Sequence, residues 1–240
     1  MISEQYVWLT WSSAFLLPWL GMFLWFHRYR KVMIWASLFT MPFGLSEPLF
    51  VPRYWDPPSL FDLAQRTGFD IESLIFCFGI GGVGTVLYNI ATDHDLKPIE
   101  SSERGKHRHQ YHRVTLLAPL IAFPILYLMP WNPIYPAVAA MTLGGTATIA
   151  CRTDLKLKTL IGGGLFAAYY AVFVLLLEWS APGYIGRVWN LPALSGVVIA
   201  GIPLEELLFG FAFGMYWSGI FEHVTWQGAA KAGATVNTGV

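Results

Sequence analysis

Two stretches of the chain decide the fold: residues 68–81 read GFDIESLIFCFGIG, and residues 201–214 read GIPLEELLFGFAFG. They align without gaps, share six of 14 residues, and carry similar side chains at most other positions. Flanking segments align within one residue of the same offset: RYWDPP at 53–58 with RVWNLP at 187–192, and YNIAT at 88–92 with FEHVT at 221–225. Chance similarity between two apolar helices would not also place Arg, Trp, Pro and Glu in register, so we predict an internal repeat.

Both stretches lie in a chain that is too apolar for a soluble domain. Of its 240 residues, 55% are hydrophobic and 12% are charged, about half of the roughly 25% that is usual in globular domains. The 15 basic residues balance the 15 acidic ones, so no basic field attracts nucleic acid. The two cysteines, Cys77 and Cys151, are too few for a disulfide scaffold or a cysteine-based zinc site. The composition predicts an integral membrane protein.

Seven apolar runs approach the ~20 residues that cross a ~30 Å bilayer core. They cover Tyr6–Phe26, Val32–Val51, Asp70–Ile90, Val114–Met129, Ile134–Ala150, Leu157–Trp179 and Ile202–Phe221. The first run lacks the basic leader of a cleavable signal peptide, so we expect it to remain as a span. A shorter run at 194–200 either extends the seventh helix or re-enters the membrane.

The repeat divides these runs into two parallel three-helix units joined by a linker helix, an all-α 3+1+3 architecture. The expected boundaries are a first repeat at 1–92, a cytoplasmic basic loop and linker helix at 93–133, a second repeat at 134–226, and a flexible cytoplasmic tail at 227–240. Because the linker crosses the membrane once, both units keep one orientation. We expect a pseudo-two-fold axis along the membrane normal, with the functional site near the interface of the units.

Basic residues orient the predicted helices. The loops on one side carry 12 lysines and arginines, and the other side carries Arg53, Arg66 and Arg187. The positive-inside rule then places the N-terminus outside and the C-terminus in the cytoplasm, as in a multi-pass protein of the cell inner membrane. Trp55 and Trp189 fall at predicted outer ends, where an interfacial aromatic belt is expected.

Glu205 and Glu206 are the leading candidates for catalysis. Pro203 fits the first turn of a helix, and the two glutamates follow in that turn. The alternative is a pair that interacts with the helix dipole at the membrane surface. Against that alternative, Glu72 holds the matching position in the first repeat. Charged side chains at bilayer depth cost about 2.5 kcal/mol or more, so they usually face a cavity or a partner.

Aromatic side chains accompany these acids in both repeats. Phe209 lies three and four residues after the glutamate pair, Phe213 continues the stripe, and Phe76 lies four residues after Glu72. Ordinary core or lipid packing is the alternative for each ring. Further candidate substrate-binding residues lie near the predicted outer ends of the helices: Glu47, Glu178, Trp55 and Trp189. For the two glutamates among them, pairing with a neighbouring arginine is the alternative.

Together these groups favour carbocation chemistry. Two carboxyl groups in a water-poor site can hold a neutral acid beside an ionised base, so that one donates a proton and the other accepts one. Aromatic faces stabilise a passing cation. A hydrophobic polyene that enters from the lipid suits such a site.

The segment PLEELLF at 203–209 resembles the Pro-x-Glu-Glu/Asp signature of the non-flavin, integral-membrane lycopene β-cyclases. The duplicated unit with its linker resembles the fused tandem-repeat form of that family. The resemblance implies an isomerase (an intramolecular lyase) that closes the ψ-ends of lycopene into β-ionone rings in carotenoid biosynthesis, without a cofactor. It implies Glu205 and Glu206 as the acid/base pair, with Glu72 in support or in a second half-site. The first repeat departs from the signature, because DIES at 70–73 lacks the proline and the second acid.

The implied partners are a carotenoid from the bilayer and membrane lipids, with a homo-oligomer left open. Two other functions remain at this point: a proton-coupled carrier of a small solute, as built from parallel repeats with midplane acids, and a non-catalytic carotenoid-binding subunit. Few polar residues lie within the apolar runs, which disfavours the carrier. The glycines at 79–84 lie inside a predicted helix and indicate close helix packing rather than a dinucleotide site.

The segment KHRHQYHR at 106–113 is basic and rich in histidine, and DHD at 93–95 lies upstream. A metal site is one interpretation. We favour a polybasic anchor for anionic lipid head groups, to which each basic side chain contributes about 1 kcal/mol. The sequence therefore predicts no metal.

Overall fold

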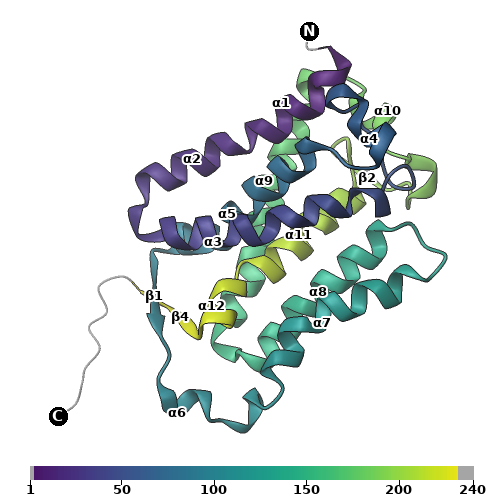
Figure 1. Cartoon of the computed structure of the whole chain (residues 1–240). Helices are drawn as coiled ribbons and strands as arrows, with labels where there is room; N and C mark the ends of the chain where they lie inside the picture. Colours follow the sequence, from purple (N-terminus) through teal and green to yellow (C-terminus); the bar gives the residue numbers. More distant parts are fainter. Residues whose placement is uncertain (1–2, 232–240) are drawn as a thin grey trace.

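The computed structural model describes residues 3–231 and is predominantly helical (Figure 1). The α-helices are α1 (Val7–Ala14), α2 (Leu16–Trp25), α3 (Arg30–Thr40), α4 (Leu63–Thr67), α5 (Ile71–Thr92), α6 (Ser101–Arg104), α7 (His112–Tyr127), α8 (Ile134–Cys151), α9 (Lys156–Ser180), α10 (Tyr184–Val188), α11 (Leu204–Trp217) and α12 (Ile220–Thr225). Short 3-10 segments are η1 (Glu4–Tyr6), η2 (His27–Tyr29), η3 (Met41–Leu49), η4 (Leu60–Asp62), η5 (His107–His109), η6 (Thr153–Leu155) and η7 (Leu191–Ala193). The strands are β1 (His94–Pro98), β2 (Val198–Ile199), β3 (Ile202–Pro203) and β4 (Gln227–Lys231).

The helical class predicted from the sequence is confirmed, and helices fall on each of the seven apolar runs. Within the described residues, four helical segments are long and apolar enough to cross a membrane: Glu4–Trp25, Ile71–Thr92, Ile134–Cys151 and Thr153–Ser180. The helices on the other three runs are shorter. Helix α3 passes into η3 next to Pro42, where proline removes a backbone donor and clashes with the preceding turn. Helix α7 has 16 residues and continues through Pro119 and Pro124.

Helix α11 occupies the centre of the bundle, where it packs against α9, α8 and α5. Helices α7 and α8 form a hairpin on one side of it, and α1 and α2 lie along the other side (Figure 1). Close approach depends on glycine, as the sequence predicts for α5. A Cβ atom at Gly81 would lie 2.5 Å from the Cβ of Thr40, and one at Gly214 would lie 2.7 Å from the carbonyl oxygen of Gly162.

Two of the strands join the segments that follow α5 and α12. Strand β1 follows α5, β4 follows α12, and the two pair antiparallel from His94 with Lys231 to Pro98 with Gln227. The first residues of the predicted tail at 227–240 thus form β4, and residues 232–240 lie outside the described residues. The apolar run at 194–200 does not extend α11, since β2 and β3 form a hairpin whose tip is exposed.

Candidate active site

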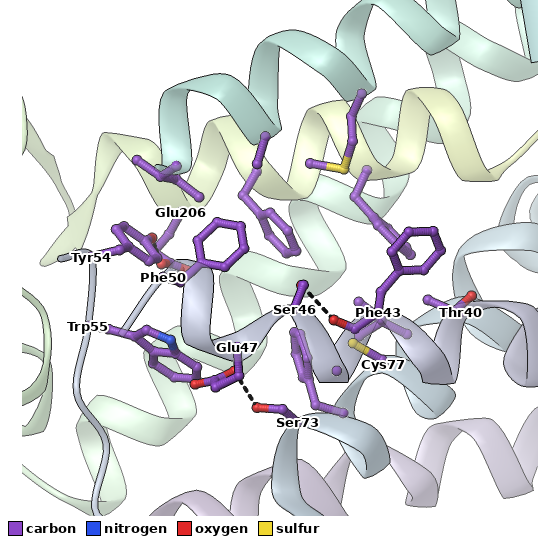
Figure 2. Close-up of a pocket in the computed structure, with 18 of the residues that line it drawn as sticks. Thr40, Phe43, Ser46, Glu47, Phe50, Tyr54, Trp55, Ser73, Cys77 and Glu206 are labelled. Carbon is purple, nitrogen blue, oxygen red and sulfur yellow. Dashed lines mark hydrogen bonds between the residues drawn. The ribbon is translucent and has the colours of Figure 1, made fainter. Parts of the chain in front are cut away.

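A cavity of about 440 Å³ lies among α5, η3, α7, α8, α9 and α11. Its walls are mostly aromatic and aliphatic, as ligand pockets of roughly 300–1,000 Å³ usually are. Figure 2 shows Glu206, Tyr54, Glu47 and Trp55 at one end of this cavity and Phe43 and Thr40 at the other. The carboxyl groups therefore face an apolar space that both halves of the chain enclose.

Glu206 is 2% exposed and lies in the first turn of α11. The helix itself begins directly after Pro203, whose backbone is extended. Its carboxylate accepts three hydrogen bonds. Trp189 Nε1 donates to Oε1 over 2.6 Å, and Tyr170 donates to Oε2 over 2.6 Å. The hydroxyl of Tyr54 donates to Oε1 as well. These donors come from three segments far apart in the chain, so Glu206 is held in one orientation at the cavity wall.

Tyr54 connects the two halves of the molecule at this point. Its side chain reaches Glu206 from the loop after η3, and its carbonyl oxygen accepts the backbone N–H of Asn190 over 2.9 Å. Burial raises the pKa of Tyr54 well above its ordinary value of 10, and the neighbouring Glu206 acts in the same direction. The phenol therefore stays protonated and remains a donor to the carboxylate.

Glu47 supplies a second carboxyl group to the same cavity. It lies in η3 and is 6% exposed. Its Oε2 accepts a hydrogen bond from Ser73 Oγ over 2.7 Å, and Trp55 lies beside it (Figure 2). Its Oε1 has no hydrogen-bond partner among residues 3–231. A buried carboxyl oxygen without a partner is available to a bound molecule.

A pair of indole rings links the two carboxyl groups. Trp55 lies beside Glu47, Trp189 bonds Glu206, and the two ring centroids are 5.4 Å apart. The backbones of the two tryptophans also form an antiparallel bridge. Both residues line the cavity, as do the other aromatic side chains predicted to contact substrate: Phe76, Phe209 and Phe213.

Glu205 and Glu72, which the sequence analysis placed in the catalytic set, do not line the cavity. Oε1 of Glu205 accepts the hydroxyl of Tyr135 over 2.7 Å and the backbone N–H of Ser195 over 2.8 Å. Oε1 of Glu72 accepts the backbone N–H of Leu60 over 2.6 Å. Each of these glutamates thus binds the loop that precedes its own helix.

Glu178 also lies away from the cavity. Its carboxylate accepts the backbone N–H groups of Gly183 and Ile185 over 2.5 and 3.0 Å, and so it holds the loop that leads into α10. Glu47 and Glu178 were both predicted from the sequence to contact substrate, but the structure brings only Glu47 to the cavity. The sequence did not indicate Tyr54 and Tyr170 as partners of Glu206. The signal for Tyr54 was weak, because the aligned position in the second repeat is Val188.

The fold and the site together define a helical protein with long apolar helices and carboxyl groups that open into an apolar cavity. A family model described as lycopene cyclase matches residues 132–224, a segment that includes Glu206, Phe209 and Trp189. The match confirms the resemblance to the lycopene cyclase family and supports an enzyme that acts in carotenoid cyclisation. Neither the curated proteins nor the solved structures include a match to the chain.

Proposed function

We propose that the chain is a lycopene β-cyclase that closes the ψ-ends of lycopene into β-ionone rings. The observation that carries the proposal is Glu206, a buried carboxyl group that faces an apolar cavity inside the segment matched by the lycopene cyclase family. The walls of that cavity suit a polyene, because they offer it aromatic and aliphatic contacts and few polar groups.

Cyclisation needs one proton to enter and one to leave. A carboxylic acid adds a proton to the terminal double bond of the ψ-end and leaves a tertiary cation. The double bond that lies across the forming ring attacks this cation, which makes the new carbon–carbon bond and moves the charge onto the ring. A base then removes a ring proton, and the freed electron pair becomes the ring double bond. Substrate and product are isomers, so no electrons are gained or lost.

In this scheme Glu47 donates the proton and Glu206 accepts one. Oε1 of Glu47 has no hydrogen-bond partner among residues 3–231 and can present a proton to the cavity. Glu206 has three donors around it, and that set suits a carboxylate because the indole N–H of Trp189 can only donate. Phe76 and Phe209 line the same cavity, and in this proposal their rings stabilise the intermediate cation.

Glu205 and Glu72 take a positioning role in this proposal instead of the catalytic role expected from the sequence. Each accepts a backbone N–H from the loop before its helix, at Ser195 and Leu60 respectively. Their matching contacts support the internal repeat, as does the antiparallel bridge between Trp55 and Trp189. We propose on this basis the fused 3+1+3 arrangement of two units around a pseudo-two-fold axis.

The membrane topology remains part of the proposal. Four described helical segments are long and apolar enough to span a bilayer. The distribution of basic residues supports a cytoplasmic C-terminus, and we propose the cell inner membrane as the location. The carotenoid would then enter the cavity from the lipid.

The test is expression in a host that accumulates lycopene, followed by chromatography of the extracted carotenoids. We expect γ-carotene or β-carotene, and the ratio of one-ring to two-ring products shows how many ends are processed. Unchanged lycopene beside a chain shown to be folded in the membrane would overturn the proposal. Co-purified lycopene without product would instead support the carotenoid-binding subunit, and proton-coupled uptake of a solute would support the carrier.

A further inference from the structure

A second cluster of reactive side chains lies away from the cavity. Its members are His109 in η5, His112 at the start of α7, and Cys151, the last residue of α8. The cavity is lined by Ile134 and Met141 from the opposite half of α8. The cluster is therefore separate from the proposed active site and takes no part in the mechanism above.

All three side chains turn inward. His109 is 6% exposed, His112 is 9% exposed, and Cys151 is 2% exposed. Lipid head groups cannot reach these two histidines, so the polybasic interpretation of residues 106–113 does not account for them. The neighbouring His107 is exposed, which shows that the segment buries its histidines selectively.

The two sulfur–nitrogen distances in the cluster match those of a tetrahedral metal site. Cys151 Sγ lies 3.4 Å from Nδ1 of His109 and 3.5 Å from Nδ1 of His112, and a ligand atom from each of the three residues lies within 4.8 Å of the others. Bonds from Zn²⁺ of about 2.3 Å to sulfur and about 2.0–2.1 Å to nitrogen, at tetrahedral angles, place sulfur about 3.6 Å from nitrogen. The sulfur–nitrogen distances therefore match those around a bound ion to about 0.2 Å.

Hydrogen bonding explains part of this arrangement, because Nε2 of His109 accepts from Arg108 and leaves Nδ1 to donate to the sulfur of Cys151. The two bonds to the sulfur are weak. A thiol has one hydrogen and its sulfur is a weak acceptor. It gives little compensation for burying two imidazole rings with the same nitrogen turned toward it. A metal ion bound to a thiolate and two imidazoles compensates all three groups for their loss of contact with water.

The surroundings also resemble those of metal-bound histidines. Nε2 of His109 lies 3.7 Å from a carboxylate oxygen of Glu103. In metal sites a carboxylate next to the ring nitrogen that does not bind the metal commonly orients the histidine. The ring of Trp226 stacks on His112 with centroids 4.0 Å apart. His223 is fully buried with its ring 4.6 Å from that of His112, and its Nε2 has no hydrogen-bond partner among residues 3–231.

Two arginines oppose cation binding, and both are matched by acids. Arg152 follows Cys151 and bonds Asp154 over 2.9 and 2.7 Å. Arg108 Nε donates a hydrogen bond to Nε2 of His109 over 3.4 Å, and its guanidinium bonds Glu103, which also pairs with Lys106. A metal ion on Nδ1 of His109 requires Nε2 to carry the hydrogen, so Arg108 would release Nε2 and Glu103 would accept the N–H. Asp154 neutralises Arg152, and Glu103 is shared by Arg108 and Lys106, so a thiolate at Cys151 supplies the negative charge beside a divalent cation.

We propose that His109, His112 and Cys151 bind a Zn²⁺ ion, with a water molecule as fourth ligand and the unpaired Nε2 of His223 beside it. The ion would tie η5, α7 and α8 together at the end of the bundle away from the cavity. Its role is structural, because no group of the proposed active site lies near it. This inference does not depend on the cyclase assignment.

The test measures zinc in the full-length chain purified in detergent from cells supplied with zinc. We expect one zinc ion per chain in the unaltered protein. Loss of most of this zinc is expected in His109→Asn and Cys151→Ser. The matched control is His107→Asn, which changes an exposed histidine of the same segment and should keep the ion. No zinc in the unaltered chain, or equal zinc in all four proteins, would overturn the proposal.

A second measurement covers variants that fail to fold. In a Cys77→Ser background, Cys151 is the remaining thiol, and its alkylation by a maleimide is followed with and without Zn²⁺ on a chelator-treated sample. Bound zinc should slow the alkylation about tenfold or more and a chelator should reverse the effect, because the coordinated thiolate is withdrawn from reaction. Equal alkylation rates under both conditions would contradict the site.

Discussion

The starts of α5 and α11 align in sequence but present different groups to the cavity. Both helices begin with a glutamate that binds the preceding loop, Glu72 in α5 and Glu205 in α11. The next residue faces the cavity in each case. It is Glu206 in α11 and Ser73 in α5.

In the first half, a carboxyl group from another segment lies next to the aligned serine. Ser73 donates its hydroxyl to Glu47 of η3 over 2.7 Å, and both residues line the cavity. The comparison shows that an acid that holds a loop is common to the starts of both helices. The acid that faces the cavity comes from α11 in one half and from η3 in the other.

The largest effect should come from the second half. Glu206→Gln removes the proposed base but keeps the side-chain volume, and we expect cyclisation to fall by roughly 10²–10⁴-fold, the usual contribution of a general acid or base. Ring formation per amount of membrane-inserted protein measures it. Glu100→Gln, in an exposed loop, is the control and should keep full activity. Activity of Glu206→Gln within a factor of three of the unaltered chain would contradict the role of α11 in this comparison.

The first half should depend on Glu47 and not on its aligned serine. Glu47→Gln is expected to reduce cyclisation by about 10²-fold if this residue donates the proton. Ser73→Ala removes one neutral hydrogen bond to the carboxyl group, so we expect a loss of about tenfold or less. If the serine variant is the more damaged of the two in the same carotenoid assay, Glu47 is not the group that replaces the missing acid.

The sequence predicted the helical class, the positions of the helices and the aromatic wall of the cavity. These depend on runs of apolar residues and on spacing along one helix, which a sequence states directly. The sequence also predicted Glu205 and Glu206 as an acid/base pair. The structure separates them, because consecutive residues of an α-helix point about 100° apart and cannot easily face one cavity together.

Contacts between distant segments could not be predicted in the same way. Tyr54 and Glu206 are 152 positions apart. The entry of Glu47 into the cavity depends on the 3-10 geometry of η3, which apolar periodicity does not predict. Likewise, the interpretation of residues 106–113 lacked Cys151, which lies 39 positions after His112 and joins it because α7 and α8 form a hairpin.

The two aligned glutamates provide a test of what the repeat preserves. Glu72→Gln and Glu205→Gln each weaken a charge-assisted hydrogen bond to a loop, and we expect each to cost about 1–2 kcal/mol of stability. The loss should appear in denaturant or thermal unfolding in detergent, with cyclisation reduced less than in Glu206→Gln. Similar losses for the two variants would support equivalent roles. A Glu205→Gln chain of full stability and no activity would return Glu205 to the catalytic set.

The smallest expected effect concerns Tyr54, which joins the halves. Its pKa is raised in the folded chain above the ordinary value of 10, chiefly by burial and then by Glu206. In the unfolded chain the phenol ionises near pH 10, while in the folded chain it keeps its proton. Its contribution to stability is thus fully present below pH 10 and declines as the pH rises above 10.

We expect the unaltered chain to lose stability more steeply than Tyr54→Phe between pH 9 and about 11. The difference in slope should be less than the ~1.4 kcal/mol per pH unit that one proton allows. Tyr111→Phe is the control, because Tyr111 is 62% exposed and should leave the slope unchanged. Parallel curves for the unaltered chain and Tyr54→Phe would show that the folded chain does not hold Tyr54 as a buried, protonated phenol beside Glu206.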